Sequence, residues 1–169
     1  MRLIDGHLQV PETMLRLVDA GIWPSEQTNL ELQNLSPIVA PDSIRIWAPE
    51  ERTVYFYPIP TVSIQTLIDG GDRFWLSEIA APSGLNHKLA ATIGDFGIGS
   101  DAPIVLDYRS SLTLPRVLRL RWNNDGNEWI KISNSFDEFV DLAGLAKATP
   151  RFREPSDARK SPVGREFKS

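Results

Sequence analysis

The residues best suited to chemistry surround a glycine-rich loop, GDFGIGSD, at residues 94–101. Its glycines, Gly94, Gly97 and Gly99, follow an apolar run, and a loop of this kind can cradle a phosphate group. The G-x-x-G-x-G spacing, however, reverses the dinucleotide-binding fingerprint, and no Lys-Ser or Lys-Thr pair follows as in a Walker A loop. A strand is predicted after the loop, so no helix N-terminus is available to hold an anion. We therefore interpret the glycines as residues that permit positive φ in a connection between two strands.

Three carboxylates, Asp95, Asp101 and Asp107, surround the same loop at intervals of six residues. Calcium and magnesium prefer oxygen ligands, but this spacing does not match the EF-hand pattern. Aspartates in loops commonly accept hydrogen bonds from nearby backbone N–H groups. We therefore expect solvated carboxylates at these positions, and neither a metal nor a cofactor.

Other catalytic groups are scarce in this chain. There is no Cys, which excludes a thiol nucleophile, a disulfide and a Cys-ligated zinc. The two histidines, His7 and His87, belong to no metal-ligand or triad pattern, and there is no G-x-S-x-G elbow. A carboxylate pair of the kind that hydrolyses glycosides stays open, because the 19 acidic residues before position 151 offer many pairs and nothing singles one out.

Charge is unevenly distributed along the 169 residues. Residues 1–150 hold 12 basic and 19 acidic side chains, a net charge of −7, whereas residues 151–169 carry a net charge of +3. An acidic body argues against nucleic acid as a partner and is compatible with a basic protein partner. Apolar periodicity ends near Pro150, so we expect one domain at 1–149 and a charged, flexible tail at 150–169.

No apolar run has the length that a signal peptide or a transmembrane helix needs. We therefore expect a cytoplasmic location and no membrane partner.

The first half of the chain is predicted to contain helices and a hairpin. Helices are expected at 11–20 and at 26–35, the second with Ser25 as its N-cap. Segment 44–60 is predicted as a hairpin, because side chains alternate on both sides of the turn APEER. A further short helix is expected to contain three apolar residues: Phe74, Trp75 and Ile79.

The second half predicts a three-stranded antiparallel meander followed by a helix. The expected strands are 103–108, 116–122 and 128–133. An Asp-Gly turn joins the last two strands. Ser135 and Glu138 fit a capping box at the start of the final helix. The predicted fold is therefore α+β, with an antiparallel sheet (a hairpin plus a three-stranded meander) flanked by N-terminal and C-terminal helices.

The order of these segments resembles the bacterial SUKH superfamily, which includes the yeast cell-wall assembly regulators of the Smi/Knr type. The resemblance is carried by IGDFGIGSDAPIVLDYR (93–109), PRVLRLRW (115–122) and WIKISNSFDEFVDLAGL (129–145), and extends to APEERTVYFYPIP (48–60) and the Phe-Trp pair at 74–75. It covers roughly residues 10–145. It implies an α+β fold with an antiparallel sheet and flanking helices, and no catalytic residues are attributed to the family.

Many bacterial members are inferred to be immunity proteins that bind and neutralise a toxin, often a nuclease. The resemblance therefore implies a non-catalytic protein-binding domain whose partner is a cognate toxin. The residues predicted to bind this partner are the loop carboxylates and an aromatic side chain expected to be exposed: Asp95, Phe96, Asp101 and Asp107. Two alternatives stay open, namely a regulatory or scaffold domain without a toxin partner and an enzyme that uses carboxylates in a deep cleft.

Overall fold

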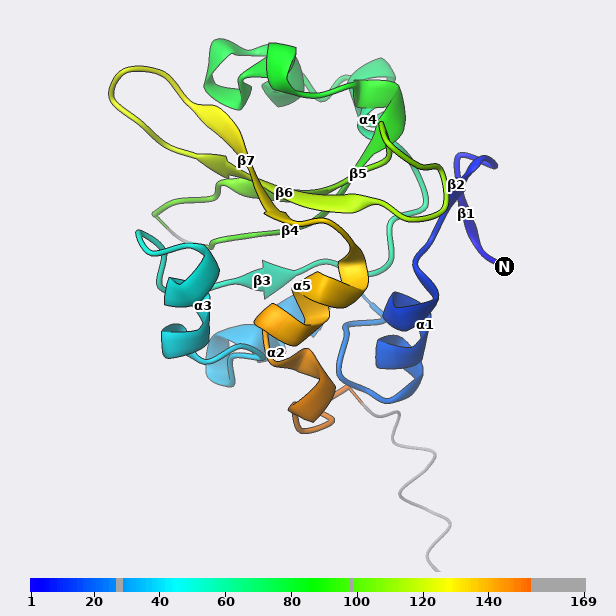
Figure 1. Ribbon diagram of the computed structural model, residues 1–169, viewed down its shortest axis with the longest axis vertical. Coiled ribbons are helices and arrows are strands. Elements are labelled where there is room, and N and C mark those ends of the chain that lie inside the picture. The colour runs from blue at the N-terminus through cyan, green and yellow to red at the C-terminus, as the bar shows by residue number, and fades with distance from the viewer. Residues whose placement is uncertain (27–28, 98, 153–169) are drawn as a thin grey trace, which may run out of the picture.

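The computed structural model describes residues 1–26, 29–97 and 99–152, and in them helices are combined with antiparallel strands (Figure 1). This confirms the predicted α+β class. The strands are β1 (Leu3–Ile4), β2 (Leu8–Gln9), β3 (Tyr55–Phe56), β4 (Ala90–Asp95), β5 (Pro103–Asp107), β6 (Arg116–Arg121) and β7 (Glu128–Ser133). The α-helices are α1 (Glu12–Asp19), α2 (Asn29–Leu35), α3 (Pro41–Trp47), α4 (Ile64–Asp69) and α5 (Phe136–Leu142). The 3₁₀ helices are η1 (Phe74–Leu76), η2 (Glu78–Ala80), η3 (Pro82–Gly84), η4 (His87–Leu89) and η5 (Leu145–Lys147).

The main sheet has five antiparallel strands in the order β3-β4-β5-β6-β7, and β1 and β2 form a separate hairpin. The predicted meander is confirmed as β5, β6 and β7. It is longer than predicted, because the apolar run before the glycine-rich loop is strand β4, which pairs with β5. Strand β3 then pairs with β4 and lies at one edge of the sheet.

The predicted hairpin at 44–60 is wrong, because its first half is helix α3. Pro41 begins this helix, and the fixed φ of proline suits the first helical turn. Ile44 and Trp47, three residues apart, are buried in the core, whereas Ile46 is 70% exposed. The apolar side therefore follows the helical spacing of three residues and not the alternation of a strand.

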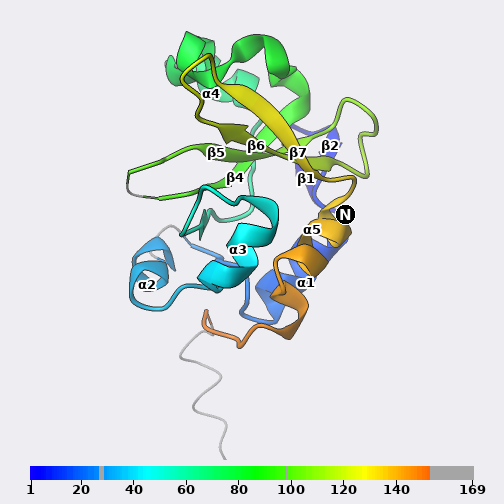
Figure 2. The same cartoon turned by 60° about the vertical axis from the view of Figure 1, so that its left-hand side comes forward.

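The sheet lies between two helical layers (Figures 1 and 2). The larger core packs α1, α3 and α5 against one face, through residues such as Met14, Ile44 and Phe139. The smaller core packs α4 and η1 against the other face, through Ile64 and Trp75. Since both faces are covered, every residue of β5 is buried.

Three of the other predicted helices are confirmed with changes at their ends, and the fourth is not a single helix. The N-terminal helix is α1, and α5 begins after Ser135, whose hydroxyl accepts from the N–H of Glu138 at 3.1 Å. Helix α2 begins at Asn29, and the Asn29 side chain accepts from the N–H of Ser25 at 3.0 Å, so Ser25 is not its N-cap. The helix expected around Phe74, Trp75 and Ile79 consists of the separate 3₁₀ helices η1 and η2.

The described chain continues to pack on the domain past the predicted boundary at 149. The backbone N–H groups of Arg151 and Phe152 both donate to the carbonyl of Gly21, at 2.7 and 2.9 Å. Phe152 is buried. Of the tail predicted at 150–169, residues 153–169 lie outside the described residues.

The outer edge of β3 is closed by side chains instead of another strand. Gln33 of α2 is 1% exposed; its Nε2 donates to the Phe56 carbonyl at 2.9 Å, and its Oε1 accepts from the Phe56 N–H at 2.8 Å. Trp23 Nε1 donates to the Tyr57 carbonyl at 2.8 Å. The Gln33 amide thus pairs with Phe56 as a neighbouring strand would, and it ties α2 to the sheet.

Replacing Gln33 tests this closure. We expect Gln33→Leu to lower the free energy of unfolding by about 3 kcal/mol, because it leaves a buried N–H and a buried carbonyl of Phe56 without partners. Denaturant unfolding measures the change. Asn34→Leu, at the next and exposed position of α2, is the control and should cost less than about 1 kcal/mol. Equal effects of the two variants would contradict the role of the amide.

Candidate partner-binding site

Two adjoining pockets form a groove between α2, β3 and the loop that joins β4 to β5. Their volumes are about 520 Å³ and about 220 Å³. Both are lined by Leu30, Tyr57 and Asp95, and we call them together the acidic groove. Figure 2 shows α2 below the β4–β5 loop, so residues far apart in the sequence meet here.

Tyr57 lies at the centre of the acidic groove. Its hydroxyl donates to the carboxylate of Asp95, and Asp95 Oδ1 also accepts from the N–H of Gly97 at 2.6 Å. Burial raises the pKa of Tyr57, the hydrogen bond to Asp95 raises it further, and the charges of Asp95 and Asp101 add to this because they would repel a phenolate. The structure therefore places two of the predicted residues, Asp95 and Asp101, around one neutral phenol.

The groove is lined by both acidic and apolar side chains. Glu31, Asp95 and Asp101 supply carboxylates, and no Lys or Arg is among the described residues that line the two pockets. The apolar part consists of Leu30, Pro58, Ile59, Pro60, Val62 and Leu67. A lysine or arginine side chain suits such a surface, because its aliphatic stem can pack on apolar groups while its charged head pairs with a carboxylate.

The glycines of the loop have two different roles. Gly97 and Gly99 have positive φ, at 77° and 97°, which confirms the interpretation for these two. At Gly94 the interpretation is wrong: Gly94 is absent from the positive-φ residues, and a Cβ there would lie 2.3 Å from the carbonyl oxygen of Tyr55. Gly94 is therefore needed for the close approach of β3 to β4.

The side of the loop away from the groove is anchored by a buried acid. Glu51 is 7% exposed, and its Oε1 accepts from the Ser100 hydroxyl at 2.8 Å. Trp122 Nε1 donates to the Ser100 carbonyl at 2.7 Å. Burial raises the pKa of Glu51, the Ser100 hydrogen bond opposes this, and the nearby Glu50 carboxylate adds to it. The Glu51 carboxyl thus holds Ser100 of the loop, and burial makes its charged form unfavourable.

Glu50 contrasts with Glu51. It pairs with Arg119, a buried residue of β6 that also lies 6.0 Å from the ring centroid of Phe96. Burial alone would raise the pKa of Glu50, but the hydrogen bond and the charge of Arg119 hold this pKa below its ordinary value. Neither Glu50 nor Glu51 is among the residues that line the groove.

The expectation that Phe96 is exposed is wrong. Phe96 is 1% exposed and packs in the larger core, with its ring centroid 5.7 Å from that of Trp47. Because neighbouring residues of an extended chain point to opposite sides, Asp95 faces the groove while Phe96 faces the core. Phe96 anchors the loop to the larger core and is not available to a partner.

Asp107 is likewise removed from the expected acidic surface. It lies at the end of β5 away from the loop, is 1% exposed, and forms ion pairs with Arg109 and Arg116. Burial alone would raise the pKa of Asp107, but hydrogen bonds from the two arginines hold it below its ordinary value. The three aspartates therefore do not form one set, since only Asp95 and Asp101 share the groove.

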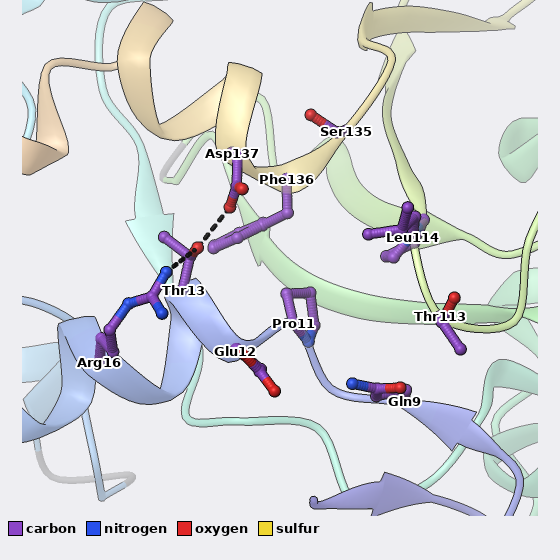
Figure 3. A pocket seen from close by; sticks show the side chains of 11 residues that line it. Gln9, Pro11, Glu12, Thr13, Arg16, Thr113, Leu114, Ser135, Phe136 and Asp137 are labelled. Atoms are coloured by element: carbon purple, nitrogen blue, oxygen red, sulfur yellow. Dashed lines mark hydrogen bonds between the residues drawn. The ribbon is translucent and has the colours of Figure 1, made fainter.

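A separate pocket of about 440 Å³ lies between the starts of α1 and α5 and the chain before β6 (Figure 3). The Thr13 hydroxyl donates to the carboxylate of Asp137, and Arg16 Nη2 donates to Thr13 Oγ1 at 3.0 Å. Leu114, on the opposite wall, is 69% exposed. Because its hydrogen bonds join α1 to α5, we interpret this polar cluster as a link between helices.

Glu31 and Tyr57 are among the groove residues that the sequence does not predict. Tyr57 lies in the alternating segment 44–60, and its position next to Pro58 carries no signal of a hydrogen bond to Asp95. Glu31 reaches the groove because Gln33, on the same helix, binds the edge of β3. No local sequence pattern predicts either contact.

Within residues 1–26, 29–97 and 99–152, no group of three or more His, Asp or Glu side chains is arranged to hold a metal ion. Neither His7 nor His87 lines the groove. No helix in the same part of the chain has both the length and the apolar character to cross a membrane.

Comparison with known proteins gives no match. No protein-family model matches the chain, and searches of curated proteins and of solved structures find no similar protein. The resemblance to the SUKH superfamily therefore stays a prediction.

The two loop glycines offer a matched test of the packing in the groove. A Cβ at Gly97 would lie 2.0 Å from the Tyr55 ring, whereas nothing lies within 4 Å of one at Gly99. Both variants strain a positive φ, so we expect Gly99→Ala to cost about 1 kcal/mol and Gly97→Ala about 3 kcal/mol of unfolding free energy. Denaturant unfolding checks the difference, and a larger loss at Gly99 would contradict the observed packing.

The raised pKa of Glu51 predicts a pH dependence of stability. The folded state binds the Glu51 proton more tightly than the unfolded state, so this residue's contribution falls as the pH rises from the ordinary value of 4.5 through the folded pKa. Glu51→Gln keeps an acceptor for Ser100 and removes the charge. We expect this variant to be more stable than the parent at pH 7, by about 1 kcal/mol, and to lose that advantage near pH 4.

Thermal unfolding at several pH values measures this difference between the two proteins. Glu50→Gln is the control, because it weakens the pair with Arg119 and should destabilise the protein at pH 7. An advantage of Glu51→Gln that persisted unchanged to pH 4 would show that charge is not its cause.

Proposed function

We propose that this chain is a non-catalytic domain that binds a basic protein partner through the acidic groove. The observation that carries the proposal is the lining of the groove, where Glu31, Asp95 and Asp101 meet beside apolar residues with no cation among the described lining side chains. Opposite charges speed and orient association, and apolar contacts around them contribute affinity.

The identity of the partner is proposed from the resemblance of segments 93–109, 115–122 and 129–145 to the SUKH superfamily. On this basis the domain is an immunity-type protein of the cytoplasm, and the partner is a toxin whose basic active-site surface the groove covers. A nuclease suits this proposal, because its surface must be basic to bind phosphates.

The alternative is a regulatory or scaffold domain that binds a basic protein without neutralising it. The same groove would serve both roles, and protection of cells against a toxin distinguishes them. A carboxylate enzyme is less well supported, because Asp95 is occupied by Tyr57 and the Gly97 N–H, and the buried Glu51 does not line the groove.

Charge reversal in the groove tests the proposal. The chain would be produced together with the product of the adjacent gene, and the affinity would be measured by calorimetry. We expect Asp101→Lys to weaken binding by about tenfold or more, because it places a like charge against the partner. Asp125→Lys, which makes the same charge change at an exposed position of the β6–β7 turn, is the control and should bind as the parent does.

Protection of cells that express the adjacent gene product would be measured with the same variants. Loss of protection with Asp101→Lys alone supports immunity, whereas binding without protection supports the scaffold role. Equal affinity of the parent and both variants would refute the acidic groove as the binding site.

A further inference from the structure

Basic side chains gather at the other end of β5 from the acidic groove. A pocket of about 370 Å³ on the face covered by α4 and the 3₁₀ helices is lined by Arg109, Arg116 and Lys131. Its remaining wall includes Leu118 and the indole of Trp129. We call this the cationic pocket. The pocket gathers positive charge although residues 1–150 have a net charge of −7.

One buried carboxylate orients two of these cations. Asp107 Oδ1 accepts from Nε of Arg109 at 2.9 Å, and Asp107 Oδ2 accepts from Nε of Arg116 at 3.1 Å. The Nη2 groups of both arginines also donate to Asp107. Among the described residues, no hydrogen-bond partner is found for Nη1 of Arg109 or Arg116, and these side chains are 36% and 30% exposed. Each guanidinium is therefore fixed on one side and keeps free N–H donors on the other.

The charges of the pocket are incompletely balanced. Asp107 offsets one of the two guanidinium charges. The ammonium of Lys131 donates to the neutral amide of Asn134 at 2.7 Å, so its charge is not offset. Glu128, the acidic residue of the lining, is paired with Arg121. An excess of two positive charges is thus held around one cavity, and an anion would relieve the repulsion among them.

The wall of the pocket is held in place by its own contacts. Trp129 Nε1 donates to the Ala80 carbonyl at 2.8 Å, and the Trp129 ring stacks on Trp75. A Cβ on Gly84 would lie 2.6 Å from Cδ1 of Trp129, so the indole packs directly against the Gly84 backbone. The cations therefore face an apolar surface that is already in place, as in sites for small organic ligands.

We propose that the cationic pocket binds the phosphate group of a small phosphorylated molecule. A phosphate monoester carries about two negative charges at pH 7 and three strong acceptor oxygens, which match the charge excess and the three cationic donors. The volume suits a compact ligand whose organic part rests on Trp129 and Leu118. This site is distinct from the acidic groove, and the proposal does not depend on the function proposed above.

Titration of the labelled protein tests the site. Inorganic phosphate, glucose 6-phosphate and the dicarboxylate succinate would each be added at constant ionic strength, and the NMR signals of the arginine Nε–H and tryptophan Nε1–H groups would be followed. We expect saturable shifts at Arg109, Arg116 and Trp129 with both phosphates, and tighter binding of glucose 6-phosphate. Linear shifts without saturation, or equal affinity for succinate, would overturn the proposal.

Lys131 gives the cleanest variant, because its one hydrogen bond among the described residues is to the exposed Asn134. We expect Lys131→Gln to weaken phosphate binding about fivefold without changing the melting temperature. Lys147→Gln, which removes an exposed lysine of η5, is the matched control and should leave the affinity unchanged. Equal loss in the two variants would mean that only the overall charge attracts phosphate, and this too would overturn the proposal.

Discussion

The edge of the sheet at β3 is closed mainly by the buried amide of Gln33, and the acidic groove depends on this contact. An edge strand exposes N–H and carbonyl groups that attract other strands, and burying them without partners is costly. Gln33 satisfies both groups of Phe56 and so fixes α2 against β3. Helix α2 then brings Leu30 and Glu31 to the side of the sheet where Asp95 and Asp101 lie. The hydrogen bonds of Gln33 that satisfy the backbone of Phe56 thus also bring together the residues of the acidic groove.

Strand β5 connects two sites of opposite charge. The loop before it carries Asp101 next to the acidic groove, and its last residue, Asp107, lies beside the cationic pocket. Every residue of β5 is buried, and the residues before Asp107 are apolar. The strand therefore separates the two regions without an exposed charge between them. Asp101 is exposed and adds negative charge to the surface of the groove. Asp107 is buried between two arginines, so it orients positive charge instead.

Local patterns in the sequence predict the second half of the fold well. The strands at 103–108, 116–122 and 128–133 are bounded by turn residues, and the capping residue Ser135 marks the start of α5. The hairpin at 44–60 could not be decided in this way, because four residues such as Ile44–Trp47 fit a strand and a helical turn equally well. The packing of Trp47 against Phe139, which are far apart in the chain, favours the helix.

The sequence predicts only part of the site, again because the remaining contacts are non-local. Asp95 and Asp101 are close in the sequence and remain close in space, whereas the burial of Phe96 depends on α3 and α5. The ion pair of Asp107 with Arg116 likewise depends on β6, which follows after a loop. Charge and glycine content indicate where a functional loop lies. They do not reveal which of its side chains face the solvent, since that is decided by non-local packing.

The shortness of α2 has a consequence for the motions of the protein. An isolated helix of seven residues is unstable in water, so α2 remains helical because it is docked on β3. Its undocking breaks the two hydrogen bonds of Gln33 but leaves the pairing of β4 with β5 intact. The amide proton of Phe56 should therefore exchange with solvent through local opening, while those of β5 require unfolding of the whole sheet. One wall of the acidic groove then belongs to a unit that can open without unfolding the sheet, and a partner bound there would slow this exchange.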